Sequence, residues 1–385
     1  MTERVNQRIG DLTRAGGIGY LCEYPGCRIF IKRDDLAEPP ADGHLGGNKP
    51  RIAEELVKDI RAGQYTAVIS YGSASSNMNR AIAQMARREG ISCYVIVKIE
   101  EPFVPAGNDP AAGAGNDSRR SVSDVGNGSR ESAAGYAASD TFCTENERLV
   151  RESGAEIICC RPDRVKETVE AVFAKSRARG EKPYYIFGDS TGRGNEAALM
   201  RASYLEYAEI EAFEKQEGIS FDHIVLTVGT CMTVSGFACA LAGAQARTRL
   251  VGISAARGRE ACLKKIAECA ACFAGQGGKD CEETSGGAQM ACGRPMHFEL
   301  PVILDEYLCG GYGKYDEVIE RVIRACPKNY GIPLDPVYTG KAFYGMLEEI
   351  RAGRLSGDIL FIHTGGYPIY LDWAAGCPSG CSGSV

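Results

Sequence analysis

The sequence predicts an α/β protein of two domains, each with an open, mostly parallel twisted sheet flanked by helices. Segments rich in β-branched and aromatic residues alternate with amphipathic segments along most of the chain, which is the order that builds βαβ units. Turns rich in glycine and hydroxyl groups repeatedly join a strand to the next helix. A length of 385 residues, 44% of them hydrophobic and 24% charged, suits two globular domains.

The charge balance and the chain start narrow the classes of function. The formal net charge is -6 and the pI is near 5.5, which argues against nucleic acid or an anionic membrane as a partner. Residues 1–8 lack the apolar core of an export signal, and no run reaches the roughly 18 apolar residues of a spanning helix. We therefore expect a cytoplasmic enzyme or binding protein.

Lys49 stands between the first predicted strand, 28–32, and an amphipathic helix, 52–61, that stops at Gly63. It therefore lies at or just before a helix N-terminus, where the positive dipole end disfavours a protonated amine. A lysine whose charge is disfavoured is the better nucleophile that Schiff-base chemistry requires. The alternative is an ordinary surface lysine near a helix start.

The next unit has strands at 65–72 and 91–98 around a helix at 81–88, so this part of the sheet should be parallel. Its hydroxyl-rich turn, 73–80, follows the carboxyl end of a strand, where open α/β sheets bind ligands. The alternative is an N-cap cluster. Residues 102–140 lose apolar periodicity and predict an insertion, either a lid or a disordered excursion.

The remaining pattern continues the alternation. Gly229, Thr230 and Thr233 lie between a strand at 221–228 and a helix at 237–244, and such a turn supplies N–H groups and hydroxyls to a phosphate. It matches neither phosphate-loop nor dinucleotide patterns, so a single phosphate fits better. The other predicted elements are helices at 144–153, 164–179, 196–216, 316–326 and 343–352, and strands at 155–160, 182–187, 250–254 and 358–362.

Seventeen cysteines are many for a chain without an export signal, and we expect most to be buried thiols. Cys269 and Cys272 have the spacing of a metal knuckle or redox pair. A zinc ribbon usually repeats that spacing, and the repeat is absent here, so we expect no metal. The alternative is a metal or iron–sulfur site built from Cys262, Cys269, Cys272, Cys281 and Cys292.

With its turns aligned, the chain resembles the fold type II, or tryptophan-synthase-β-like, pyridoxal phosphate enzymes. Within them it is similar to the branch that holds D-cysteine desulfhydrase and 1-aminocyclopropane-1-carboxylate deaminase. The likeness spans most of the chain, apart from residues 102–140 and the cysteine-rich segment. Four motifs carry the likeness and follow the family's order: residues 46–49 with Arg51; Ser76 and Asn77 with Arg80; residues 334–341; and residues 363–366. The turn 229–236 is also similar to the family's phosphate-binding turn.

The resemblance implies an architecture with pyridoxal 5'-phosphate in a cleft between two domains. The larger, cofactor-binding domain would comprise residues 1–54 and 161–385. The smaller, inserted domain would comprise residues 55–160. The resemblance also implies a homodimer that acts on a small amino acid.

The resemblance implies a role for each matching residue. Lys49 would bind the cofactor covalently and then move the substrate's α-proton. Asn77 would contact the ring hydroxyl of the cofactor. Ser76 would face the substrate carboxylate or assist proton transfer. Tyr312 and Tyr338 would line the substrate side, one as acid or base. The residues that would hold the phosphate are Gly229, Thr230, Cys231, Met232 and Thr233.

Thr339 falls where the family places the partner of the pyridine nitrogen. A hydroxyl there keeps the nitrogen less firmly protonated than a carboxylate, which makes the ring a weaker electron sink. This favours α,β-elimination and resembles the desulfhydrase more than the deaminase, whose position carries a glutamate. Departures from the family pattern at Cys231, Met232, Ile52 and Ser75 leave the substrate open.

We therefore expect a lyase that converts a small amino acid to a 2-oxo acid, ammonia and a leaving group such as sulfide. A β-replacement synthase and a ring-opening deaminase are alternatives of the same class. An alternative of another class is a metal- or cluster-binding regulatory protein on the same scaffold.

Overall fold

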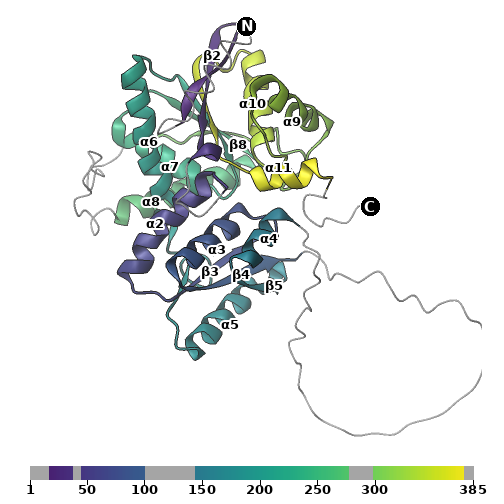
Figure 1. Ribbon diagram of the computed structural model, residues 1–385. Coiled ribbons are helices and arrows are strands. Elements are labelled where there is room, and N and C mark those ends of the chain that lie inside the picture. Colours follow the sequence, from purple (N-terminus) through teal and green to yellow (C-terminus); the bar gives the residue numbers. More distant parts are fainter. Residues whose placement is uncertain (1–16, 38–44, 100–143, 277–297, 377–385) are drawn as a thin grey trace, which may run out of the picture.

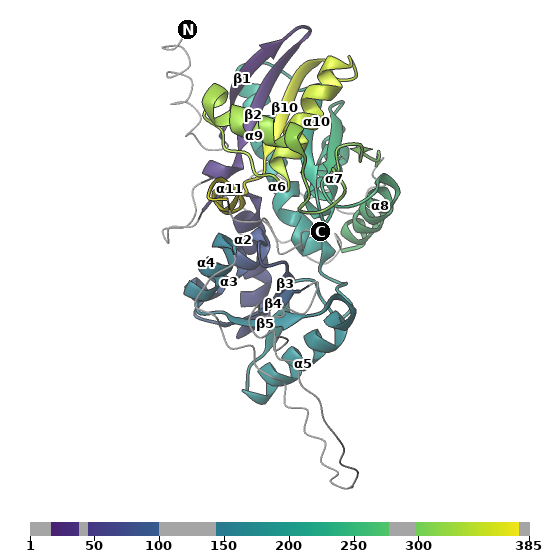
Figure 2. The same cartoon turned by 90° about the vertical axis from the view of Figure 1, so that its right-hand side faces the viewer.

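The computed structural model describes residues 17–37, 45–99, 144–276 and 298–376, and it confirms the predicted α/β class. Two separate sheets form the framework, with helices packed on their faces (Figure 1). The view turned by 90° also separates the smaller sheet, with α5, from the larger one (Figure 2). The predicted low-complexity segment 102–140 lies outside the described residues. None of the helices in the described ranges has the length and apolar character that spanning a bilayer requires.

Among the described residues, the larger sheet has six strands, and each neighbouring pair is parallel except the first. The sequence analysis missed β1, which is a half-exposed edge strand, and β9, which has three residues. The strand order is β1 (Ile18–Tyr24), β2 (Cys27–Arg33), β10 (Gly357–His363), β7 (His223–Val228), β8 (Arg249–Ser254) and β9 (Val302–Leu304).

Side-chain alternation along the strands gives the larger sheet two buried faces. On β2, Ile29 and Ile31 pack in the core under α9 and α10, whereas Phe30 packs in the core under α6, α7 and α8. A further helix, α11, was not predicted. The helices of this part are α6 (Glu196–Glu217), α7 (Met232–Ala244), α8 (Arg259–Gln276), α9 (Glu317–Tyr330), α10 (Thr339–Arg351) and α11 (Tyr367–Ala374).

The smaller sheet is parallel throughout its described strands, as predicted. On β4, Val95 packs toward α2, α3 and α4, and Ile96 packs toward α5. Its strand order is β5 (Glu156–Cys160), β4 (Ser92–Lys98), β3 (Ala67–Gly72) and β6 (Pro183–Tyr185). The helices nearest to it are α2 (Asn48–Ala62), α3 (Asn77–Glu89), α4 (Glu145–Glu152) and α5 (Val165–Ala178), and two short 3₁₀ turns are η2 (Asp34–Leu36) and η3 (Pro162–Arg164).

The strand pairing bears on the expected domain division, which stays a proposal. The expected smaller domain ends at residue 160, yet β6 pairs in parallel with β3, with Ala67 opposite Pro183. We therefore propose that the smaller domain continues through α5 and β6 before the chain returns to the larger one.

Four helices begin about one turn earlier than the sequence predicted. The starts are at Asn48, Asn77, Met232 and Thr339, whereas apolar periodicity becomes visible only at residues 52, 81, 237 and 343. The first turns of α2, α3 and α10 are mostly polar or contain glycine, and the first turn of α7 alternates apolar and hydroxyl residues, so none of the four carries the apolar period of a helix. The turns predicted to bind ligands are therefore helix N-termini with their preceding loops.

Buried charges fix α2 against β2 and α6. Lys32 Nζ lies 2.6 Å from Asp34 Oδ1 and 3.1 Å from Glu206 Oε1, and these side chains are at most 1% exposed. On α2, Arg51 Nη1 lies 2.5 Å from Glu209 Oε1. Removing one partner would leave an uncompensated buried charge. The network therefore sets how α2 is rotated about its axis.

Gly47 and Gly365 pack backbone against backbone where β2 and β10 end side by side. A Cβ on Gly365 would lie 2.6 Å from Gly47 Cα. The Gly47 N–H donates to Asp34 O at 2.8 Å, and the Asn48 N–H donates to Thr364 O at 3.1 Å. The start of α2 is therefore held on the sheet edge at a distance that only glycine permits.

Replacing Gly365 tests this contact. Gly365 has a φ of +100, so Gly365→Ala combines left-handed strain with a backbone collision, and we expect a loss of about 2–4 kcal/mol in the free energy of unfolding. Gly26→Ala is the matched control, because Gly26 has a φ of +81 but no atom within 4 Å of an added Cβ; we expect about 1 kcal/mol there. Denaturant unfolding measures both, and equal losses would contradict the close-contact explanation.

Candidate active site

Lys49 is the second residue of α2, so it lies at a helix N-terminus as predicted. The N-cap residue, Gly47, contributes no side-chain oxygen to the first N–H groups. Burial lowers the pKa of the Lys49 amine from 10.5 to about 8, because an ammonium loses hydration there without gaining a compensating partner. A much larger fraction of Lys49 than of an exposed lysine is therefore a neutral amine at neutral pH.

The turn between β7 and α7 has the form of an anion site. Cys231, its last residue, has a left-handed φ of 72, and its side chain does not cap α7. The first N–H groups of a helix lack intrahelical partners and point toward any anion placed there. Asn48 Nδ2 donates to Thr233 Oγ1 at 3.1 Å. This bond places the start of α2, with Lys49, beside this turn.

The side chains of the turn explain its departures from a glycine-rich pattern. Cys231 and Met232 are 2% and 7% exposed and pack in the hydrophobic core, so they offer the turn backbone rather than side chains. Thr230 is exposed. A Cβ on Gly229 would lie 3.3 Å from Tyr338 Cε1. The turn therefore also borders the start of α10.

The start of α3 carries Ser76 and Asn77. Ser76 is the N-cap, and its Oγ accepts from the Asn79 N–H at 3.2 Å. Asn77 Oδ1 accepts from Asn146 Nδ2 at 3.0 Å, and Asn146 Oδ1 accepts from Arg80 Nε at 3.0 Å. Because arginine only donates, it fixes the orientation of both amides. The amide donor of Asn77 therefore faces away from Asn146.

Arg80 is a buried cation. Among the described residues, its hydrogen-bond partners are neutral groups. It is 1% exposed and donates to Leu45 O at 2.9 Å as well as to Asn146. Burial lowers the pKa of its guanidinium to about 10. Arg80 thus links the start of α3 to the segment just before Gly46 and Lys49.

The start of α10 is organised by Asp335. Its Oδ1 accepts from the Tyr338 N–H at 2.7 Å, and its Oδ2 accepts from the Thr339 N–H and hydroxyl at 3.0 and 2.6 Å. The Thr339 oxygen in turn accepts from the Asp335 N–H at 2.8 Å. Both side chains are buried. The Thr339 hydroxyl therefore donates its hydrogen to Asp335, and its oxygen can still accept one further hydrogen bond.

A chain of hydroxyl groups connects the two sheets. Tyr338 OH donates to Tyr312 OH at 3.0 Å, and Tyr312 OH lies 3.2 Å from Ser73 Oγ. Ser73 follows β3 of the smaller sheet, whereas the tyrosines belong to the larger-sheet part. Burial and the neighbouring Tyr312 raise the pKa of Tyr338 well above 10. Its hydroxyl therefore remains a proton donor at neutral pH.

These contacts bring the predicted residues of separate turns into one region, and they add residues that the sequence analysis missed. Three of them lie within sequence motifs already noted, so their position in the chain could have indicated a role: Asn48, Ser73 and Asp335. Asn146 carried no such indication, because it contacts Asn77 from 69 residues away. The roles expected for the predicted residues stay predictions at this point.

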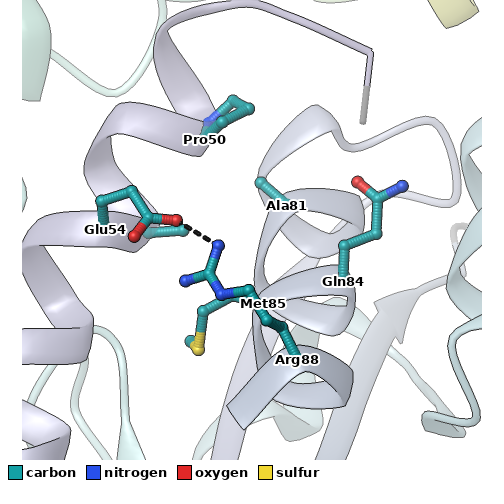
Figure 3. A pocket seen from close by; sticks show the side chains of 7 residues that line it. Pro50, Glu54, Ala81, Gln84, Met85 and Arg88 are labelled. Atoms are coloured by element: carbon teal, nitrogen blue, oxygen red, sulfur yellow. Dashed lines mark hydrogen bonds and ion pairs between the residues drawn. The ribbon is translucent and has the colours of Figure 1, made fainter. Parts of the chain in front are cut away.

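A separate small pocket lies between α2 and α3 (Figure 3). An ion pair between Arg88 Nη1 and Glu54 Oε1, at 2.5 Å, spans it. None of the predicted site residues lines it, so we do not assign it to the candidate site. Its lining residues are Pro50, Ala53, Glu54, Ala81, Gln84, Met85 and Arg88.

The cysteine cluster is only partly described. On α8, Cys262 and Cys269 are fully buried whereas Cys272 is exposed, so the helix directs them to different surroundings. Cys281 and Cys292 lie outside the described residues. Within the described ranges the cysteines are free thiols, and no three histidine, cysteine or acidic side chains are arranged to hold a metal ion.

Comparisons with known proteins give a consistent result. The family described as "Pyridoxal-phosphate dependent enzyme" matches residues 18–365. A protein described as a putative 1-aminocyclopropane-1-carboxylate deaminase from Pyrococcus furiosus is 27% identical over 89% of this chain and 85% of its own length. A D-cysteine desulfhydrase from Salmonella paratyphi A is 28% identical over 94% of this chain and 93% of its own length.

A solved structure supports the fold. The crystal structure of a homologue of 1-aminocyclopropane-1-carboxylate deaminase superposes with a TM-score of 0.69, covering 98% of this chain and 99% of the other. The sequences are 24% identical. This likeness therefore bears on the architecture alone.

The lowered pKa of Lys49 predicts a pH dependence in the protein without cofactor. A neutral acylating reagent should modify Lys49 with a midpoint near pH 8, read by mass spectrometry of its peptide. Because the folded pKa lies below the unfolded value, the unfolded chain binds more protons between pH 8 and 10.5, and the contribution of Lys49 to stability rises with pH across that interval. A labelling midpoint near 10.5 would show that burial does not affect this amine.

Proposed function

This chain belongs to the pyridoxal-phosphate-dependent enzymes, and we propose that it catalyses α,β-elimination on a small amino acid. The products would be a 2-oxo acid, ammonia and the leaving group. Two observations support the proposal. The Asn48–Thr233 hydrogen bond joins the start of α2, with Lys49, to the start of α7, and Gly229 of the preceding turn lies beside Tyr338 at the start of α10. The relatives named as deaminase and desulfhydrase set the class of chemistry.

The residues present fit pyridoxal 5'-phosphate. The uncapped start of α7, with Cys231 in a left-handed conformation, suits the phosphate. Lys49 offers an amine with a lowered pKa for the covalent link. Thr339 Oγ1, whose proton goes to Asp335, could only accept a hydrogen bond from the ring nitrogen in its protonated form, and a neutral hydroxyl oxygen would stabilise that form less than a carboxylate. The amide donor of Asn77 suits the ring hydroxyl. Each group would therefore meet a partner of matching character.

When bound, the cofactor withdraws electrons from the substrate's Cα. Lys49 Nζ, released from the cofactor when the substrate's amine takes its place, would accept the α-proton. The electron pair of the Cα–H bond would become the new Cα–Cβ π bond while the leaving group departs with its bond pair to Cβ. The hydroxyl chain of Ser73, Tyr312 and Tyr338 would supply a proton to that group, and the hydrogen bonds that link the three hydroxyls support this role. Addition of water to the released enamine gives the 2-oxo acid and ammonia.

One feature supports elimination of a desulfhydrase type over ring opening: position 339 holds a hydroxyl rather than a carboxylate, which favours a reaction in which a leaving group takes the electrons. The deaminase and desulfhydrase relatives match the chain about equally well, at 27% and 28% identity, so they support the branch rather than one reaction within it. The substrate, a homodimeric assembly and a cytoplasmic location therefore belong to the proposal.

Substitution of Lys49 tests the covalent link. Lys49→Ala should abolish both the visible absorbance of the lysine-bound cofactor and turnover, because no other residue takes its place at the start of α2. Lys58→Ala is the control, since Lys58 is on the same helix with 57% of its side chain exposed, and it should retain both. Absorbance and turnover that survive in Lys49→Ala would remove Lys49 from the mechanism.

A substrate screen tests the reaction. The purified protein is incubated with D- and L-cysteine, serine, diaminopropionate and aminocyclopropane carboxylate, and release of 2-oxo acid, ammonia and sulfide is measured. We expect D-cysteine to give all three products in equal amounts. Turnover of the cyclopropane alone would favour the deaminase, and products formed only with an added nucleophile would favour a β-replacement synthase. A colourless protein with stoichiometric zinc or iron would contradict the enzyme assignment.

A further inference from the structure

Lys341 is a buried cation that the proposed chemistry does not use. It is fully buried at the third position of α10, where the positive end of the helix dipole disfavours an ammonium. Its Nζ donates to Leu308 O at 2.7 Å and to Gly311 O at 2.8 Å, and it lies 3.5 Å from Ala255 O. Among the described residues, its hydrogen bonds go to backbone carbonyls, and the carboxylates of Asp335 and Asp316 act on its charge from farther away.

The loop that supplies two of these carbonyls is shaped around the ammonium. It runs from β9 to α9, and Cys309, Gly310, Gly311 and Gly313 all have positive φ values, between 51 and 124. The left-handed conformation of Cys309 costs energy because it has a side chain. The two loop carbonyls at Lys341 also accept backbone bonds: Leu308 O from the Gly311 N–H at 3.0 Å and Gly311 O from the Lys314 N–H at 3.3 Å. A cation in the middle offsets the mutual repulsion of inward-pointing carbonyl oxygens.

The same loop presents Tyr312. The Gly311 carbonyl held by Lys341 immediately precedes Tyr312, whose hydroxyl contacts Ser73 and Tyr338. Tyr312 is 43% exposed, so its own packing fixes it only weakly. Tyr338 and Lys341 both lie at the start of α10. The same helix start therefore carries Tyr338 and, through Lys341, contacts the loop that carries its hydrogen-bond partner Tyr312.

We propose that Lys341 is a positioning residue: its ammonium, held by the carbonyls of Leu308, Gly311 and Ala255, fixes the 308–313 loop and thereby the Tyr312 hydroxyl in the chain that joins the two sheets. The inference rests on the proposed function, because it assigns Lys341 to the proton donor side of that reaction. It predicts that removing the ammonium affects turnover through Tyr312.

A double-mutant cycle tests the route of this effect. Lys341→Met removes the charge but keeps a side chain of similar length, and we expect it to lower kcat by about tenfold or more with little change in KM. In a Tyr312→Phe background the same change should cost nothing further, because the hydroxyl that it positions is already gone. Lys314→Met, an exposed lysine of the same loop, is the matched control and should retain activity. Equal losses from Lys341→Met in both backgrounds, or no loss in either, would overturn the proposal.

A second measurement does not depend on the reaction. Lys341→Ala deletes the atoms equivalent to n-propylammonium and leaves the three carbonyls in place. Added n-propylammonium should therefore raise the melting temperature of Lys341→Ala, whereas n-propanol should not, and neither should stabilise Lys341→Met, whose side chain fills the space. The wild-type holoenzyme in the same series controls for reaction of the amine with the cofactor.

The two measurements separate the possible failures. If the wild type turns over none of the amino acids but n-propylammonium stabilises Lys341→Ala, the proposed function fails while the cation-centred loop stands. If the wild type is active but the amine has no effect on Lys341→Ala, the role of the ammonium is wrong and the proposed function is unaffected.

Discussion

The arrangement of the site depends on the backbone contact between Gly47 and Gly365 at the adjoining ends of β2 and β10. It lets α2 begin directly on the sheet edge, with the Asn48 N–H bonded to Thr364 O and the Asn48 side chain bonded to Thr233. The position of Lys49 relative to the start of α7 is therefore set by main-chain contacts and by the hydrogen-bonded side-chain amide of Asn48. A side chain at either glycine would separate the groups that the cofactor must touch together.

Helix N-termini provide the second constraint. The site gathers the starts of α2, α3, α7 and α10, whose positive ends favour the anionic cofactor and substrate and disfavour a protonated Lys49. The same field makes a cation at the start of α10 costly, and the carbonyls around Lys341 supply the compensation that the helix cannot. The charge of Lys341 therefore meets main-chain carbonyls, in contrast to the ion pairs of Lys32 and Arg51 that hold α2.

The sequence predicted the α/β class, the alternation of strands and helices and the turns that carry Lys49, Asn77, Gly229 and Thr339, because buried strands and glycine-rich turns leave local patterns. It placed four helix starts a turn late, since their first residues lack the apolar period that reveals a helix. The contact between Asn146 and Asn77 joins residues that are far apart in the chain, so no local sequence pattern predicts it. The carbonyls around Lys341 were equally hidden, because main-chain groups have no sequence signature.

The central claim is that Lys49 holds pyridoxal phosphate at the meeting point of these helix starts. Borohydride reduction of the purified holoenzyme, followed by digestion and mass spectrometry, tests it most directly. The account predicts a phosphopyridoxyl group on the peptide that contains Lys49 and on no other lysine. A modification on Lys341 or on an exposed lysine, with Lys49 unmodified, would contradict it.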